Sequence, residues 1–205
     1  GAGTAFNMNV NEVLVNRAIE LLGGKKGDYA FAHPNDHVNM AQSTNDVFPT
    51  AMRMAARLLF AELLPVLKDL EQVFREKAKE FDGILKSART HLQDAVPIRL
   101  GQEFAAYAVT IRKCQERIAT AARSLEELGI GGSASGTGLN THPQYRTKLV
   151  EYLRTWTRIE WSNAPDMREA MQSNLPIAEA SSVLRLLALD LPHFAEQFHI
   201  RISRE

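Results

Sequence analysis

A seven-residue repeat of apolar side chains in the middle of the chain limits the folds that it can adopt. Between residues 104 and 125 the spacing alternates between four and three positions, and the residues are Phe104, Ala108, Ile111, Gln115, Ile118, Ala122 and Leu125. This spacing places an apolar stripe along one side of a long α-helix, which must pack lengthwise against other helices. The single polar member, Gln115, either sets the register or oligomeric state of that packing or is a tolerated residue at the edge of the core.

Further helical patterns flank this repeat. Apolar residues recur at helical spacing over 11–22 and over 49–81, where Pro49 suits a helix start and Pro65 is expected to kink or split the helix. A helix is also predicted from His142-Pro143 to about residue 157, and a last long one from about residue 167 to beyond residue 199. Runs of alternating β-branched residues, which indicate strands, are missing from the sequence. The sequence therefore predicts an all-α fold, an extended helical bundle.

Composition excludes several classes of protein. Hydrophobic residues make up 45% and charged residues 23% of the chain, which is typical of globular proteins and not of disordered ones. The 24 basic residues balance 24 acidic ones, so neither nucleic acid nor a membrane surface is predicted as a partner. Charged residues and prolines interrupt the apolar runs, so no transmembrane helix is predicted. The single cysteine cannot form an internal disulfide, and a cytoplasmic location is the simplest interpretation.

Four polar segments separate the helical patterns and are rich in hydroxyl, amide and glycine residues. They are "GAGTAFN", "HPNDHVNMAQSTNDVFP", "RTHLQDAVP" and "GGSASGTGLNTHP". Hydroxyls, amides and free backbone N–H groups donate hydrogen bonds to carboxylate oxygens, so together these segments suit a small dicarboxylate. Taken singly, each segment is more simply explained by helix caps and turns.

His91 lies in the polar segment "RTHLQDAVP", directly after a threonine. It is either a hydrogen-bonded structural residue, a donor to a substrate carboxylate, or a proton carrier near neutral pH. The six histidines lack the spacing of metal ligands, so no metal site is predicted. The run "GIGGSASGTG" lacks both a preceding strand and a following Gly-Lys-Ser/Thr, so no nucleotide cofactor is predicted either.

Several long blocks resemble the fumarase/aspartase superfamily of lyases in order and in approximate spacing. These blocks are "GAGTAFNMNVNEV", "HPNDHVNMAQSTNDVFPTAM", "RTHLQDAVPIRLGQEF" and "GTGLNTHPQY", while "HFAEQFHIRISRE" agrees poorly. The resemblance implies that residues 1–48 are the remainder of an N-terminal helical domain with substrate-binding loops. Residues 49–205 would form an incomplete central helical bundle. It also implies a homotetramer without a cofactor, in which each site draws on three chains.

Within the superfamily, the sequence resembles the aspartate ammonia-lyases more than the fumarases. Thr44 in "QSTND" and the run "DAVPIRLGQEF" carry this distinction, because fumarases usually have a second serine at the position of Thr44. The implied reaction is the reversible deamination of L-aspartate to fumarate and ammonia, by β-proton abstraction through an aci-carboxylate intermediate. Fumarate hydratase is the alternative, and a catalytically silent helical scaffold is a further one.

The resemblance also implies roles for individual residues. A substrate carboxylate would bind to Thr4, Ser43, Thr44 and Asn45. Thr90 and His91, from a second subunit, would act in substrate binding and catalysis. Thr137 and Asn140 would lie near the site. The run His33, Pro34, Asn35 and Asp36 resembles the accessory dicarboxylate site of fumarases.

The superfamily's catalytic serine lies on a "GSSxMPxKxNP" loop that this sequence does not contain. We therefore expect the chain to be an internal fragment of a longer polypeptide, which binds substrate weakly by itself and is inactive alone.

Overall fold

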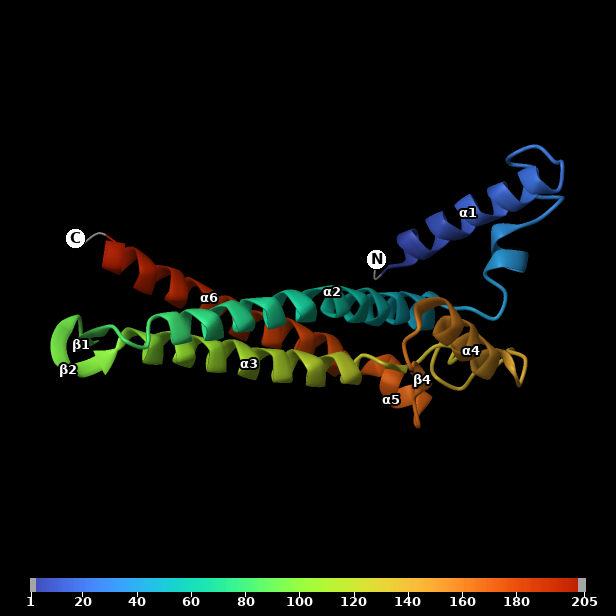
Figure 1. Cartoon of the computed structure of the whole chain (residues 1–205). Coiled ribbons are helices and arrows are strands. Elements are labelled where there is room, and N and C mark those ends of the chain that lie inside the picture. The colour runs from blue at the N-terminus through green and yellow to red at the C-terminus, as the bar shows by residue number, and fades with distance from the viewer. Residues whose placement is uncertain (1–2, 203–205) are drawn as a thin grey trace. The chain divides into compact units, whose positions relative to one another are not determined.

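The computed structural model describes residues 3–202, with side chains over 3–198, and confirms the predicted helical bundle (Figure 1). By its internal contacts the chain divides into two compact units, residues 1–55 with 124–177 and residues 56–123 with 178–205. The elements in chain order are α1 (Thr4–Leu21), the π-helical turn η1 (Pro34–Val38), α2 (Thr44–Glu80), β1 (Leu85–Thr90), β2 (Gln93–Arg99), α3 (Leu100–Ser124), β3 (Glu127–Leu128), α4 (Tyr145–Thr157), β4 (Ser162–Asn163), α5 (Met167–Gln172) and α6 (Leu175–Ile202).

The first unit holds α1, η1, the start of α2 and the short elements from β3 to α5. A core cluster of this unit is built from residues of β3 and the segment just after it, of α4, and of the turn before β4, namely Leu128, Ile130, Val150, Ile159 and Trp161. β3 and β4 pair in parallel over two residues each. Trp161 is fully buried, and its indole Nε1 donates to Thr157 Oγ1 at 2.7 Å. A large ring thus fills the core while its polar atom keeps a partner.

The second unit is a three-helix bundle in which α2, α3 and α6 lie side by side lengthwise (Figure 1). In each of the three helices, buried residues recur at intervals of seven. The residues that recur in this way are Phe60, Leu67 and Phe74 in α2, Ile111 and Ile118 in α3, and Ala180, Leu187 and Phe194 in α6. The repeat that the sequence shows in α3 therefore has counterparts in both neighbours, as lengthwise packing requires. Around Phe74, the rings of Phe104, Tyr107 and Phe194 lie with centroids 5.7–6.3 Å away.

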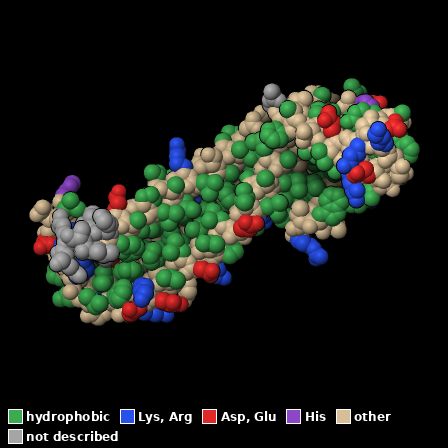
Figure 2. Space-filling model, turned by 90° about the horizontal axis from the view of Figure 1, so that it is seen from above, with side chains coloured by type: hydrophobic (Ala, Val, Ile, Leu, Met, Phe, Trp, Pro, Cys, Tyr) green, Lys and Arg blue, Asp and Glu red, His purple; other side chains and the backbone are tan. Residues whose placement is uncertain are grey.

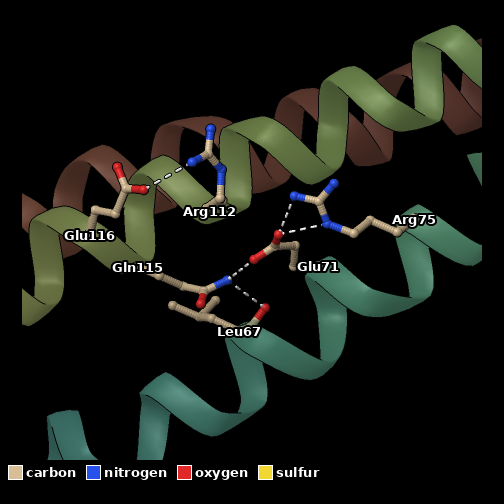
Figure 3. A network of polar contacts seen from close by, with 6 residues as sticks. All are labelled: Leu67, Glu71, Arg75, Arg112, Gln115 and Glu116. Atoms are coloured by element: carbon tan, nitrogen blue, oxygen red, sulfur yellow. Dashed lines mark hydrogen bonds and ion pairs between the residues drawn. The ribbon is translucent and has the colours of Figure 1, made fainter.

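Gln115, the polar member of the repeat, links α3 to α2 (Figure 3). Its Nε2 donates to the Leu67 carbonyl at 3.2 Å and to Glu71 Oε2 at 2.9 Å. Glu71 in turn accepts from Arg75 Nε at 2.8 Å. Because the carbonyl belongs to a particular turn of α2, the bond favours one register between the two helices. This geometry supports the register role among the alternatives that the sequence leaves open.

Replacing Gln115 by alanine should lower the free energy of unfolding by about 1–2 kcal/mol, because two half-buried hydrogen bonds are lost. The matched control is Arg112→Ala on the same helix, which breaks only an exposed pair with Glu116 and should cost about 0.5 kcal/mol or less. Urea unfolding of both variants measures the difference. Equal losses in the two variants would contradict the register role of Gln115.

Three local predictions are wrong, and of the kink or split expected at Pro65 the split does not occur, because α2 is continuous through that proline. The first wrong prediction is the start of α2, which begins at Thr44 and not at Pro49. The last helix is interrupted at residues 173–174, so that Pro176 falls in the first turn of α6, where proline is tolerated. Residues 85–99, expected to contain no strand, form an antiparallel hairpin. Among the described residues, no helix combines the length and apolar character needed to cross a membrane.

Candidate functional site

A cleft of about 730 Å³ lies in the first unit, beside the start of α2. Thr44 and Asn45, both predicted to bind a carboxylate, line this cleft, and so do Gly3, Ser135 and Arg168. Thr4 follows Gly3 as the first residue of α1 and is exposed. The helix N-terminus at Thr44 carries a partial positive charge, which favours a negatively charged ligand in the cleft.

Ser43 and Asp46 cap the start of α2. The Ser43 amide donates to Asp46 Oδ1 at 3.0 Å, and the Asn45 amide donates to Ser43 Oγ at 3.2 Å. Ser43 is thus the N-cap of α2, and Asp46 takes the role of the glutamate in a capping box by accepting from the N-cap amide. This cap explains why the helix begins at Thr44, before Pro49. The Ser43 oxygen is engaged in the cap, but its hydroxyl proton can still be donated to a ligand.

Buried asparagines on α1 orient Thr44. The Nδ2 of Asn7 donates to Thr44 Oγ1 at 3.1 Å and to Asn39 Oδ1 at 3.2 Å, and Asn11 Nδ2 donates to the same Asn39 oxygen at 2.9 Å. Asn7 and Asn11 are 7% and 3% exposed. Because Asn7 supplies a proton to the Thr44 oxygen, the Thr44 hydroxyl proton is directed away from Asn7. Sequence reasoning missed these amides, although their spacing of four residues placed them on one face of a helix.

A glycine-rich segment, residues 129–140, provides the wall of the cleft that faces α2. Asn45 Nδ2 donates to the Ala134 carbonyl at 3.0 Å, and Asp46 Oδ2 accepts from the amides of Gly131 and Ser133 at 3.1 and 3.0 Å. Thr137 and Asn140 lie farther along this segment and are exposed, outside the residues that line the cleft in the described structure. Their predicted role near the site stays a prediction.

Two buried charged residues of α2, Asp46 and Arg53, were not predicted from the sequence. Asp46 is 1% exposed, and burial raises the pKa of its carboxyl, although hydrogen bonds from backbone amides oppose this shift. Arg53 is 4% exposed and donates to the backbone carbonyls of Glu127, Ala170 and Ser173. Burial lowers the pKa of the Arg53 guanidinium. An arginine within the apolar run "AMRMAA" was the signal that could have indicated a buried polar contact.

Thr90 and His91 lie in the second unit, at the tip of the β1–β2 hairpin. Thr90 pairs with Gln93, so His91 and Leu92 form a two-residue turn. Both have positive φ, 48° and 62°, as a type I′ turn requires, yet neither is the Gly or Asn that such turns favour. Positive φ costs free energy in ordinary residues, and such strain is found most often at functional sites. His91 is exposed at this tip.

Two ion pairs hold the base of the hairpin, and most of its length is exposed. Lys86 Nζ lies 2.7 Å from Glu103 Oε1, and Arg99 Nε lies 2.9 Å from Asp82 Oδ1. The strand residues are mostly exposed on both faces, so the alternation that reveals a half-buried strand is missing. This is why no strand signal is visible in the sequence here. An exposed two-stranded sheet is marginally stable alone, so the two ion pairs help to hold the hairpin on the ends of α2 and α3.

The four residues predicted as an accessory site are the N-cap and the first three residues of the turn η1 in the first unit. His33 caps this turn, because its Nδ1 accepts from the amides of Asn35 and Asp36 at 3.2 and 3.4 Å. Pro34 is buried at the first position. The segment does not line the cleft beside Thr44. In the part of the chain that the structure describes, His, Cys, Asp and Glu side chains do not gather in the groups of three that a metal ion needs.

Comparison of the sequence with known proteins places this chain among lyases. Residues 1–205 match the family model described as "Lyase". The chain is similar to the aspartate ammonia-lyase of Bacillus subtilis, 44% identical over 203 residues, which are 99% of this chain and 43% of that protein. It is also similar to the mitochondrial fumarate hydratase of Saccharomyces cerevisiae, 46% identical over 197 residues, which are 96% of this chain and 40% of that protein.

Solved structures with similar folds agree with this family. The fumarate lyase:delta crystallin of Brucella melitensis bound to cobalt has a TM-score of 0.93 at 42% identity, covering 97% of this chain and 43% of that chain. The class II fumarase of Schistosoma mansoni has a TM-score of 0.89 at 34% identity, covering 97% of this chain and 45% of that chain. The chain therefore spans less than half the length of these relatives.

Proposed function

Since the chain belongs to the fumarase/aspartase superfamily of lyases, we propose that the protein containing it deaminates L-aspartate reversibly to fumarate and ammonia. The observation that carries this proposal is the cleft at the start of α2, where Thr44 and Asn45 present hydroxyl and amide donors beside a helix N-terminus. Such donors bind an ionised carboxylate without a metal or an organic cofactor. Thr4 and Ser43 complete the proposed carboxylate pocket.

The reaction needs a group that stabilises negative charge on a carboxylate. A base removes a proton from the carbon next to the β-carboxylate of aspartate, and the electron pair moves onto that carboxylate as the aci-form. The pair then returns to form the C=C bond while the C–N bond breaks and its electrons leave with ammonia. Neutral, preorganised donors such as the Thr44 hydroxyl stabilise the aci-form more strongly than the ground-state carboxylate. The resemblance assigns the base to a serine loop outside this sequence.

We further propose that the complete protein is a homotetramer whose sites combine residues of several chains, with Thr90 and His91 entering from a second subunit. Two features support this. His91 lies at the tip of an exposed hairpin, and large hydrophobic side chains are exposed on the second unit. Figure 2 shows such side chains gathered over α2 and α6, where Leu59, Val66 and Leu189 are more than 60% exposed. Exposed apolar surfaces of this kind indicate contacts between proteins.

Fumarate hydratase is the second candidate, because the fumarate hydratases match this chain at 44–46% identity, as well as the ammonia-lyases do. Water would take the place of ammonia, and the same donors would stabilise the aci-form. Thr44 favours the ammonia-lyase, by its resemblance to that branch. A catalytically silent scaffold would retain the bundle without any need for the buried amides that orient Thr44.

The deciding experiment assays the full-length protein, purified from its complete gene, with L-aspartate and with L-malate separately. The ultraviolet absorbance of fumarate reports both reactions. We expect fumarate from aspartate and little from malate. Preferential turnover of malate would replace the proposal by the hydratase, and no fumarate from either substrate would favour the scaffold. Light scattering of the same sample tests the tetramer.

A further inference from the structure

We infer that Asp46 is a positioning residue, whose buried carboxylate holds the glycine-rich segment in the place where it forms a wall of the cleft. Both carboxylate oxygens are used. Oδ1 accepts from the Ser43 amide at 3.0 Å, and Oδ2 accepts from the amides of Gly131 and Ser133 at 3.1 and 3.0 Å. All three of these donors are backbone N–H groups, so the contacts depend on the path of the main chain and not on side-chain identity.

The glycine-rich segment needs such support because it forms no regular secondary structure. Gly131, Ser133 and Gly136 have φ values of 86°, 60° and 89°, in the left-handed region. A non-glycine residue such as Ser133 adopts this conformation at a cost in free energy, which surrounding contacts must offset. Asp46 receives hydrogen bonds from Gly131 and Ser133, on either side of Gly132, and so fixes the strained part of the segment to α2.

Arg53 provides a second anchor on the same helix. It lies seven residues after Asp46, two turns along the same face of α2. Its guanidinium donates to the Glu127 carbonyl, before the glycine-rich segment, and to the carbonyls of Ala170 and Ser173 at 3.1 and 3.2 Å. One face of α2 thus presents an anion to backbone N–H groups and a cation to backbone carbonyls. The chain between residues 127 and 133 is fastened at both ends.

This arrangement sets the width of the cleft. Ala134 and Ser135, directly after the amide of Ser133, line the cleft together with Thr44 and Asn45. If the Asp46 contacts are lost, this wall can move away from α2 without any change in the lining side chains. The expected kinetic effect rests on the proposed function. If the cleft binds the substrate, loss of the Asp46 contacts should weaken the binding of substrate and transition state alike. Such a uniform loss raises KM and leaves kcat nearly unchanged.

The kinetic test uses Asp46→Asn and Asp46→Ser in the full-length protein. Asparagine turns one acceptor into a donor that faces the amides, and serine retains one acceptor in a smaller volume. We expect KM for L-aspartate to rise about tenfold, with kcat within about threefold of the unaltered protein. A purely structural defect would instead lower kcat in proportion to the folded fraction and leave KM unchanged. Glu160→Gln is the matched control, because the Glu160 side chain is 88% exposed in the same unit, and it should change neither constant.

Hydrogen exchange tests the contacts without any assay of activity. In the unaltered protein the amides of Gly131 and Ser133 should exchange at least about tenfold more slowly than in an unstructured peptide of the same sequence. In Asp46→Asn they should lose this protection, while the amide of Ile111 in α3 keeps its own. If both variants fail to fold, the exchange rates of the Gly131 and Ser133 amides in the unaltered protein still test whether Asp46 holds these two groups. Fast exchange there, or an unchanged KM in a folded variant, would overturn the inference. An unaltered protein without activity would instead refute the proposed function, and the exchange rates would then judge the Asp46 contacts alone.

Discussion

In the full-length protein, replacement of His91 by asparagine should lower kcat/KM for L-aspartate by at least about 100-fold. The imidazole is the proposed carboxylate donor or proton carrier, and a positioned group of this kind typically contributes 10²–10⁴-fold, roughly 3–5 kcal/mol in the transition state. Asparagine tolerates the positive φ of 48° at this position better than most residues, so the turn itself should persist. The loss of activity is therefore expected to come from the imidazole and not from the backbone.

Leu92→Asn is the matched control for His91. Leu92 is the other residue of the same turn and has a φ of 62°, so this variant relieves a comparable strain while the imidazole remains. We expect its kcat/KM to stay within about threefold of the unaltered protein and its stability to rise slightly. Steady-state kinetics with circular dichroism of both variants makes the comparison. Equal losses of activity in the two variants would assign the effect to the turn and contradict the proposed role of His91.

Replacement of Trp161 by alanine should lower the free energy of unfolding by about 3–5 kcal/mol, because a large, fully buried ring leaves a cavity. The ring packs with Leu128 and Val150, and its loss also removes the hydrogen bond to Thr157. Such a loss is a large share of the stability of an ordinary domain. Denaturant unfolding followed by circular dichroism measures it.

Trp156 offers a control of the same residue type five positions away. It is 72% exposed, so Trp156→Ala should change the free energy of unfolding by only about 0.5 kcal/mol. A loss at residue 161 no greater than that at residue 156 would show that the cluster around Trp161 does not stabilise the unit. The contrast separates burial from the size of the side chain.

The helices were predictable wherever one face is buried. The repeat in α3 is visible because Ile111 and Ile118 must face neighbouring helices, and a period near 3.5 residues follows from that contact. The hairpin was not predictable, because its strands are mostly exposed and the half-buried positions of β1, Lys86 and Ala88, are not large apolar residues. The break before α6 was missed for a related reason. The apolar residues on either side of it continue the helical pattern, and the signals for the interruption are the cap at Ser173 and the proline at 176, which also fits a kink within one helix.

The polar residues that line the site were predictable, but the buried charged residues that hold its backbone in place were not. Hydroxyl and amide residues such as Thr44 and Asn45 stand in recognisable segments, and the structure places both at the cleft. Asp46 and Arg53 bind backbone groups 74–120 residues away, and contacts with the main chain leave no pattern in the side-chain sequence. The functional roles of the predicted site residues remain proposals for the experiments above.

The shared seven-residue spacing in α2, α3 and α6 also determines which insertions and deletions the bundle can accept. One residue added between Ile111 and Ile118 would rotate the rest of α3 by about 100° and turn Ile118 toward solvent. A block of seven residues, added at equivalent positions in all three helices, would return every buried side chain to its original face. Changes of length in this bundle should therefore arise in whole heptads, coordinated among segments that are far apart in the gene.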